Sequence, residues 1–293
     1  MFSRHFGQFL LNERIVTSGD LSRAMARLGD ARPLVGILAI AKGYMTPAQV
    51  REVSALQKSE DKRFGRIAIE KGCLTAEKLE ELLSAQQNEH ILLGQILVED
   101  RSLSHDGFLR ALELYREKSG LTSEGYEAVR GGDTDRAVAS ILAGQPGAKN
   151  PLVRVWAEIF VRNIIRFVDP AAALDPLSEK NFRGCVAILQ SMKGDREFVT
   201  FMAAKEPVMA DFARRYTDLA TGAMDEMAYE ALGEFLNVSN GLFTVNCSDR
   251  GVELDLQPQE QVSADDPRIC RKPDGLIPLL LPEGILWAGI CCP

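Results

Sequence analysis

Four glycines at one fixed interval constrain the first half of this chain more than any other feature. They are 29 residues apart each time, at Gly7, Gly36, Gly65 and Gly94. Ten residues after each glycine stands a hydroxyl residue: Thr17, Thr46, Thr75 and Ser104. An apolar residue follows each hydroxyl residue by four positions: Leu21, Val50, Leu79 and Phe108. A recurring interval of this length is typical of repeat architectures. The sequence therefore predicts four copies of one structural unit in residues 1–118.

Each copy carries the signals of two short helices. Thr46 begins the sequence Thr-Pro-Ala-Gln, with a hydroxyl N-cap, proline at the first helical position and glutamine at the third. Gly43 and Gly72 lie shortly before such starts, where the preceding helix needs a left-handed residue to end. The outer copies place Arg14 and Arg101 there. The same backbone conformation would cost each arginine about 1 kcal/mol relative to glycine.

The third copy, RFGRIAIEKGCLTAEKLEELLSAQQ, resembles the N-terminal domain of type II secretion and type IV pilus assembly ATPases (GspE/MshE-like). Members of that family with the pattern RLGxxLxxxGxIxxxxLxxxLxxQ bind cyclic di-GMP. The matching positions are Arg63, Gly65, Gly72 and Gln86. The second copy has Leu34 in place of the arginine, and the family's two motifs have a longer spacer than 29 residues permits. The resemblance implies an all-α module and a cyclic di-GMP site. The alternative is a docking or oligomerisation module whose glycines serve only helix ends and packing.

The rest of the chain predicts a linker and a second domain. Residues 119–150 are rich in glycine and predict a linker with one short helix at 134–142. Residues 151–293 then predict, in order, one helix, two strands, two helices and three strands: 152–169, 185–192, 194–203, 207–219, 225–245, 252–258, 275–283 and 284–292. This order predicts a multi-domain protein whose second domain is α+β, with an antiparallel sheet and helices on one face. The apolar strands Ile277–Leu281 and Ile285–Ile290 would either form a homodimer through the sheets or be buried within one subunit.

Within the predicted helix at 225–245, Glu234 and Asn237 stand three residues apart and share one helix face. Asparagine inside a helix costs roughly 0.7 kcal/mol relative to alanine, so Asn237 needs an explanation. One explanation is that Asn240-Gly241 ends the helix and that Asn237 lies in a fraying last turn. The other is a function for the two side chains.

These residues resemble the motif of the CheC/CheX/FliY family of chemotaxis phosphatases, and the single copy is similar to CheX-like members. The family pattern is Asp/Ser-x3-Glu-x2-Asn-x22-Pro. Glu234 and Asn237 match it, Glu230 stands where Asp or Ser is usual, and Pro258 follows after 20 intervening residues. The resemblance implies dephosphorylation of the phosphoaspartate of a CheY-like response regulator, which supplies its own Mg²⁺ and lysine. Asn237 would orient a water molecule, and Glu234 would pair with that lysine.

Charge and motif content exclude several other classes of protein. Residues 1–118 have a net charge of +1 (17 basic, 16 acidic) and residues 119–293 have −8 (17 basic, 25 acidic). No basic stretch predicts a nucleic-acid partner. No apolar stretch approaches the roughly 20 residues of a membrane span, and residues 1–16 contain no signal-peptide core, so a cytoplasmic location is expected. The scattered cysteines and histidines predict neither a metal site nor a disulfide framework, and the Walker A motif is absent.

Two functional hypotheses follow from the sequence. The first is a phosphatase for a phosphorylated receiver domain, with the helical repeats as a docking or regulatory module. The second is a non-enzymatic signalling adaptor that binds receiver domains or other proteins, with repeats that bind a further protein or cyclic di-GMP. The Glu234/Asn237 pair favours the phosphatase. Glu230 and the shortened spacing to Pro258 favour the adaptor.

Overall fold

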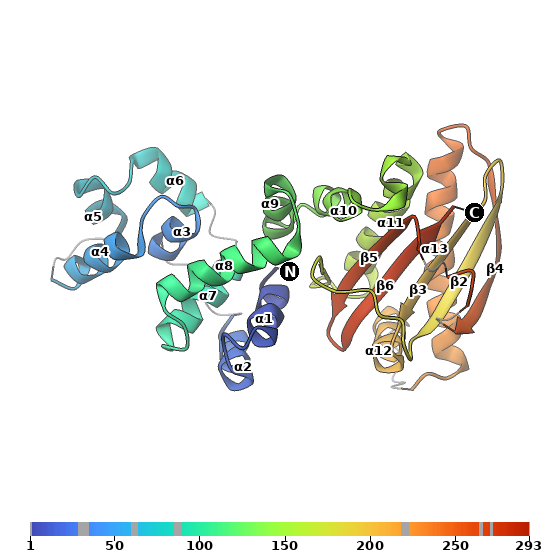
Figure 1. The fold of residues 1–293 in the computed structure, drawn as a ribbon, viewed down its shortest axis with the longest axis horizontal. Coiled ribbons are helices and arrows are strands. Elements are labelled where there is room, and N and C mark those ends of the chain that lie inside the picture. The colour runs from blue at the N-terminus through green and yellow to red at the C-terminus, as the bar shows by residue number, and fades with distance from the viewer. Residues whose placement is uncertain are drawn as a thin grey trace. The chain divides into compact units, whose positions relative to one another are not determined.

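The chain divides into two compact units, Met1–Ser119 and Gly120–Pro293 (Figure 1). The computed structural model describes residues 2–28, 35–59, 64–84, 89–217, 223–263, 266–269 and 272–292 of the 293 in the chain. Within these ranges, no helix combines the length and the apolar character needed to cross a membrane.

The first unit consists, in its described part, of helices that come in pairs. The first helices of the pairs are α1 (Phe2–Asn12), α3 (Val35–Ala41), α5 (Phe64–Glu70) and α7 (Glu89–Glu99). The second helices are α2 (Ser18–Arg27), α4 (Pro47–Ser59), α6 (Ala76–Ser84) and α8 (His105–Ser119). The first helices end, and the second helices begin, at intervals of 29 residues. The helix boundaries therefore have the same interval as the four glycines.

Close packing within each pair explains the glycines. Gly36 lies so near to Val50 that a Cβ on the glycine would be 2.9 Å from Cγ1 of the valine. A Cβ on Gly65 would be 2.7 Å from Cδ1 of Leu79. Real Cβ contacts are longer, so each glycine lets the second helix pack directly against the backbone of the first.

The connections between paired helices share one left-handed residue. The φ angles are 69° at Gly43 and 68° at Gly72, and they are 56° at Arg14 and 59° at Arg101. The predicted left-handed position is thus confirmed, including at the two arginines. Thr46 accepts a hydrogen bond from the backbone N–H of Gln49 (3.2 Å), whose side chain accepts one from the N–H of Thr46 (2.8 Å). This reciprocal pair is the expected capping box of α4.

The second unit is an α+β domain built around one antiparallel sheet. Its helices are α9 (Ser123–Gly131), α10 (Thr134–Leu142), the 3-10 helix η1 (Pro146–Lys149), α11 (Pro151–Phe167), α12 (Glu206–Thr217) and α13 (Glu226–Ser248). Its strands are β1 (Ala173–Leu174), β2 (Val186–Gly194), β3 (Phe198–Ala204), β4 (Leu254–Ser263), β5 (Gly275–Leu281) and β6 (Gly284–Cys291). The strand order is β1-β5-β6-β3-β2-β4, and every neighbouring pair is antiparallel. The predicted α+β class and antiparallel sheet are confirmed.

Helices α11, α12 and α13 cover one face of the sheet (Figure 1). On the other face, Leu189 and Phe201 belong to an apolar cluster to which loop residues Phe182 and Ile269 contribute. The closing strands β5 and β6 are buried within the chain, since Ile277, Leu279, Leu286 and Ile290 are all fully inaccessible. Of the two expectations for these strands, burial within one subunit is the one that this structure has.

The structure differs from the expected linker at residues 119–150. Gly120–Asn150 belong to the second unit, and they form α9 and α10, which pack on each other. The side-chain amide of Gln145 pairs with the backbone of β5, donating to the carbonyl of Leu276 at 2.8 Å and accepting from its N–H at 2.6 Å. The glycines that predict a loop have local roles instead: Gly132 ends α9 in the left-handed conformation, and Gly147 donates to the carbonyl of Asp274.

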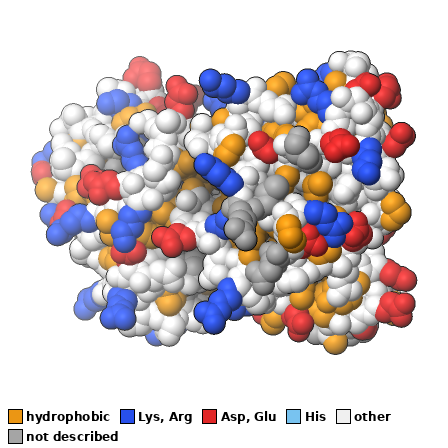
Figure 2. Space-filling view, turned by 45° about the vertical axis from the view of Figure 1, so that its right-hand side comes forward, with side chains coloured by type: hydrophobic (Ala, Val, Ile, Leu, Met, Phe, Trp, Pro, Cys, Tyr) orange, Lys and Arg blue, Asp and Glu red, His pale blue; other side chains and the backbone are white. Residues whose placement is uncertain are grey.

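On the face drawn in Figure 2, the lysine and arginine side chains of the described residues are interspersed with acidic and uncharged ones. Two arginines of the second unit, Arg214 and Arg268, pair with acidic neighbours on their own or an adjacent element.

Candidate functional site

Helix α13 carries both residues of the predicted phosphatase motif. It spans Glu226–Ser248, and Asp225 caps its start by accepting a hydrogen bond from the N–H of Ala228 at 2.9 Å. The explanation that the helix ends near Asn240-Gly241 is therefore wrong, because the helix continues to Ser248. Asn237 lies in the helix interior, one turn after Glu234, so its helix-propensity cost is not explained by a fraying end.

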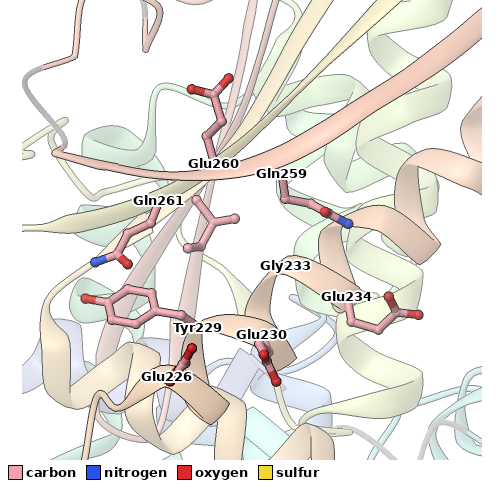
Figure 3. Close-up of a pocket in the computed structure, with 9 residues that line it drawn as sticks. Glu226, Tyr229, Glu230, Gly233, Glu234, Gln259, Glu260 and Gln261 are labelled. Carbon is pink, nitrogen blue, oxygen red and sulfur yellow. The ribbon is translucent and has the colours of Figure 1, made fainter.

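Glu234 is exposed and lines an acidic groove between α13 and β4 (Figure 3). The groove residues are Ile188, Glu226, Tyr229, Glu230, Gly233, Glu234, Gln259, Glu260 and Gln261. Glu226, Glu230 and Glu234 follow one another at intervals of four along the same helix face. Glu260 points to the opposite side of β4 (Figure 3), where it accepts from Arg268 at 2.7 Å. Among the described residues, Glu234 has no hydrogen-bond or ion-pair partner.

The negative charge of Glu234 acts on a neighbouring aromatic side chain. Burial raises the pKa of the Tyr216 hydroxyl above its ordinary value, and the Glu234 carboxylate adds to this rise. The ring of Tyr216 packs edge-on against Phe235, the residue that follows Glu234, with centroids 5.4 Å apart. The carboxylate thus stands beside an apolar aromatic surface, where it is available to a cation from a partner.

Asn237 is half-buried and is held by a residue of the sheet that the sequence did not single out. The side-chain nitrogen Nε2 of Gln190, on β2, donates to Oδ1 of Asn237 at 2.8 Å. Gln190 itself is 1% exposed. Within the described part of the chain, the Nδ2 atom of Asn237 makes no hydrogen bond, so its two N–H groups are available to a ligand.

Gln190 belongs to a buried polar network between α11, α13 and the sheet. Asn240, also completely buried, donates from Nδ2 to Oε1 of Gln190 at 2.7 Å and to Oγ1 of Thr200 at 2.8 Å. The indole Nε1 of Trp156, on α11, donates to Oδ1 of Asn240 at 3.0 Å. Buried amides are costly without partners, and this network supplies them.

A bulge in β4 provides a second anchor for Gln190. Gln190 pairs with Gln259 and Met192 with Leu256, so two residues of β4, Gln257 and Pro258, oppose one residue of β2. Proline is tolerated at a bulge on an edge strand because it has no N–H to pair. The carbonyl of Gln257 accepts from Nε2 of Gln190 at 2.9 Å. The proline expected from the family pattern is thus adjacent to the carbonyl that holds Gln190.

An exposed apolar stripe continues from the motif along α13. Val238, Leu242 and Val245 recur at helical spacing, and Leu242 and Val245 are 46% and 60% exposed. Large exposed apolar side chains that cluster on one helix face are typical of a surface that binds another protein.

The predicted cyclic di-GMP residues are only partly within the described structure. Arg63 and Gln86 lie outside the described residues. Gly65 packs against Leu79, and Gly72 occupies the left-handed turn after α5. A shallow pocket beside Gly65 is mainly apolar, with Val35, Phe64 and Ile69 in its lining. Helix packing and the turn account for both glycines without a ligand.

Comparison with known proteins finds similar structures but no related sequence family. No family model matches the chain, and no curated protein matches it significantly. The chemotaxis protein CheX from Vibrio vulnificus is 16% identical over 48% of this chain and 98% of its own, with a TM-score of 0.41. The CheX–CheY–BeF3–Mg²⁺ complex from Borrelia burgdorferi aligns at 16% identity over 46% and 95% of the two chains, with a TM-score of 0.36. FliY from Thermotoga maritima aligns at 15% identity over 55% and 90%, with a TM-score of 0.32. The similarity to these proteins is therefore one of structure, at low sequence identity.

Proposed function

We propose that the second unit dephosphorylates the aspartyl phosphate of a CheY-like response regulator, and that the helical first unit is its docking or regulatory module. The observation that carries the proposal is that two functional side chains lie one turn apart on the same face of α13. Glu234 is an exposed carboxylate, and it precedes Asn237 by one turn. The oxygen of Asn237 is held by the sheet, and within the described residues neither the Glu234 carboxylate nor the Asn237 nitrogen has a hydrogen-bond partner. These residues also match the phosphatase motif.

The chemistry needs little more than this pair. Glu234 binds the active-site lysine of the regulator and sets the position of the partner. The Asn237 amide orients a water molecule in line with the phosphorus, and Mg²⁺ comes from the regulator. Positioning of this kind lowers the barrier because the water no longer loses its orientational freedom in the transition state. The acidic groove lined by Glu226 and Glu230 attracts the same cationic region of the partner.

The test measures loss of phosphate from a panel of receiver domains, phosphorylated with a small phosphodonor in the presence of Mg²⁺. Wild type is expected to accelerate the loss from one of them. Asn237→Ala should lower kcat about a hundredfold with binding nearly unchanged, since water orientation is lost. Glu234→Gln should raise KM instead, because the ion pair with the lysine is lost.

Glu197→Gln is the matched control. It removes one exposed charge of the second unit from the turn between β2 and β3, outside the groove, and should change both constants less than twofold. Acceleration by Asn237→Ala equal to that by wild type would contradict the role of Asn237, and no acceleration by wild type would contradict the phosphatase. The second candidate function, a non-enzymatic adaptor, is favoured by the exposed Val238, Leu242 and Val245. Saturable binding of a receiver without acceleration of phosphate loss would establish that function.

A further inference from the structure

The hydrogen bonds of the buried network under α13 allow only one assignment of donors and acceptors. This assignment determines which atom of Asn237 faces a ligand. The indole of Trp156 can only donate, so the atom of Asn240 that it contacts must be the oxygen. The other atom of that amide is then a nitrogen, and it donates to Gln190 and Thr200. The Gln190 atom that accepts this bond must in turn be Oε1.

The same logic continues from Gln190 to the surface. Its remaining atom is Nε2, which lies 2.9 Å from the backbone carbonyl of Gln257 and 2.8 Å from the Asn237 amide. A carbonyl can only accept, so this assignment agrees with the one that begins at Trp156. Nε2 therefore donates to Asn237 as well, and the Asn237 atom facing inward is Oδ1. The outward atom is Nδ2.

We propose that Gln190 is a positioning residue, held between the Gln257 carbonyl and Asn240, that makes Asn237 present a hydrogen-bond donor to its ligand. An amide on a helix surface can turn over and exchange its oxygen and nitrogen. Gln190 removes this freedom because the reversed amide would place N–H against N–H. The presented donor suits an oxygen, such as that of the attacking water or of the phosphoryl group. The catalytic part of this inference rests on the proposed phosphatase function, and the amide orientation does not.

The first measurement follows amide exchange with solvent by NMR, with the Asn237 side-chain signals identified by their loss in Asn237→Asp. In wild type, the Nε2 protons of Gln190 should exchange slowly and the Nδ2 protons of Asn237 rapidly. In Gln190→Glu, studied at a pH at which the buried carboxyl group is ionised, the side chain accepts instead of donating. Asn237 then turns over, and its Nδ2 protons should become protected. Slow exchange of Asn237 already in wild type would overturn the orientation.

The second measurement compares kinetic constants for the receiver that wild type dephosphorylates. Gln190→Glu and Gln190→Met should lower kcat about tenfold or more, with KM within twofold of wild type. The matched control is Ser239→Ala. Ser239, on α13, is fully buried and accepts a hydrogen bond from Asn163, on α11, at 3.0 Å. Within the described residues, neither Ser239 nor Asn163 forms a hydrogen bond with Gln190 or Asn237. The Ser239→Ala variant should have a lower free energy of unfolding than wild type and the same kcat.

The outcomes separate the inference from the function on which it depends. If Gln190→Glu retains the wild-type kcat, or if Ser239→Ala loses as much kcat as Gln190→Glu, Gln190 has no positioning role and the phosphatase function stands. If wild type accelerates no phosphate loss while the exchange pattern is as expected, the proposed function fails and the amide orientation stands.

Discussion

Gly94 of α7 and Phe108 of α8 are in such close contact that a Cβ on the glycine would lie 2.2 Å from Cε2 of the phenylalanine ring. The same relationship joins Gly7 to Leu21, but there the distance to Cδ1 is 2.9 Å. The position is equivalent in both pairs, while the apolar partner differs in size and rigidity. The consequences of adding a methyl group should differ accordingly.

Gly94→Ala should lower the free energy of unfolding of the first unit by about 1–3 kcal/mol, because the phenylalanine ring must move out of a packed position. Gly7→Ala should cost less, since the leucine can change its side-chain conformation. The measurement is chemical unfolding followed by circular dichroism. Gly19→Ala is the control, because its nearest side-chain neighbours are 3.6 Å or more away. It should stabilise by about 0.5–1 kcal/mol. An unchanged midpoint for Gly94→Ala would contradict the close contact.

The left-handed turns predict opposite effects at equivalent positions. Arg14→Gly and Arg101→Gly should each raise the free energy of unfolding by up to about 1 kcal/mol, since glycine adopts positive φ without steric cost. Gly43→Ala and Gly72→Ala should lower it by a similar amount. Among the described residues, no neighbouring atom lies within 4 Å of a Cβ placed on either glycine, so their packing does not contribute. Thermal unfolding of the four variants measures the effect of backbone conformation alone. Destabilisation by Arg14→Gly would show that its side chain has a role.

The attachment of Gln145 to β5 predicts that the segment before α11 stabilises the second unit. In Gln145→Glu, the carboxylate can still accept from the N–H of Leu276 but faces its carbonyl oxygen without a proton to donate. The expected loss is about 1–3 kcal/mol, the cost of an unsatisfied, partly buried polar group. Urea unfolding, followed by tryptophan fluorescence, measures it, since Trp156 and Trp287 both belong to this unit. A wild-type midpoint would show that residues 120–150 behave as a linker after all.

Two cysteine thiols should be unreactive because burial raises the pKa of both. Burial raises the pKa of Cys247 to about 11. Burial, and then the Asp274 carboxylate, raise the pKa of Cys292 to about 11. At pH 8 only about one thiol in a thousand is then the reactive thiolate. Iodoacetamide followed by mass spectrometry should detect almost no modification of either at pH 8 and full modification in urea. Raising the pH to 10 should accelerate modification of Cys292, which is partly exposed, about a hundredfold. Fully buried Cys247 should still require an opening of the structure. Equal rates for Cys292 in buffer and urea at pH 8 would contradict the raised pKa.

The features that sequence analysis predicted well are those that depend on near neighbours in the chain. The left-handed positions at Arg14 and Arg101 follow from their place after a helix, and the turn at Pro282–Gly284 joins β5 and β6 as expected. Hydrogen bonds of caps and turns join residues three to five apart, so short patterns contain their information. The prediction of a linker at residues 119–150 failed for the converse reason, although its short helix at 134–142 is present as α10. Gly125 packs against Ser140, and Gly147 packs against Asp274, which is more than a hundred residues away in the sequence.

The candidate site was likewise predictable only in part. Glu234 and Asn237 were recognisable because a helix places residues three apart on one face. No pattern in the sequence marked Gln190 as a site residue, because a glutamine after four apolar strand residues resembles the end of a strand. One of the two explanations that the sequence allows makes Asn240 a helix terminator, whereas Asn240 is buried and accepts a hydrogen bond from Trp156, 84 residues earlier. The sequence alone determined the helix periods, the order along the chain of the five longer strands (β2 to β6) and the identity of the Glu-x-x-Asn pair. Only the tertiary structure decided how Asn237 is held. An amide has no preferred orientation of its own, and it acquires one from donors and acceptors that folding brings together from α11, β2 and β4.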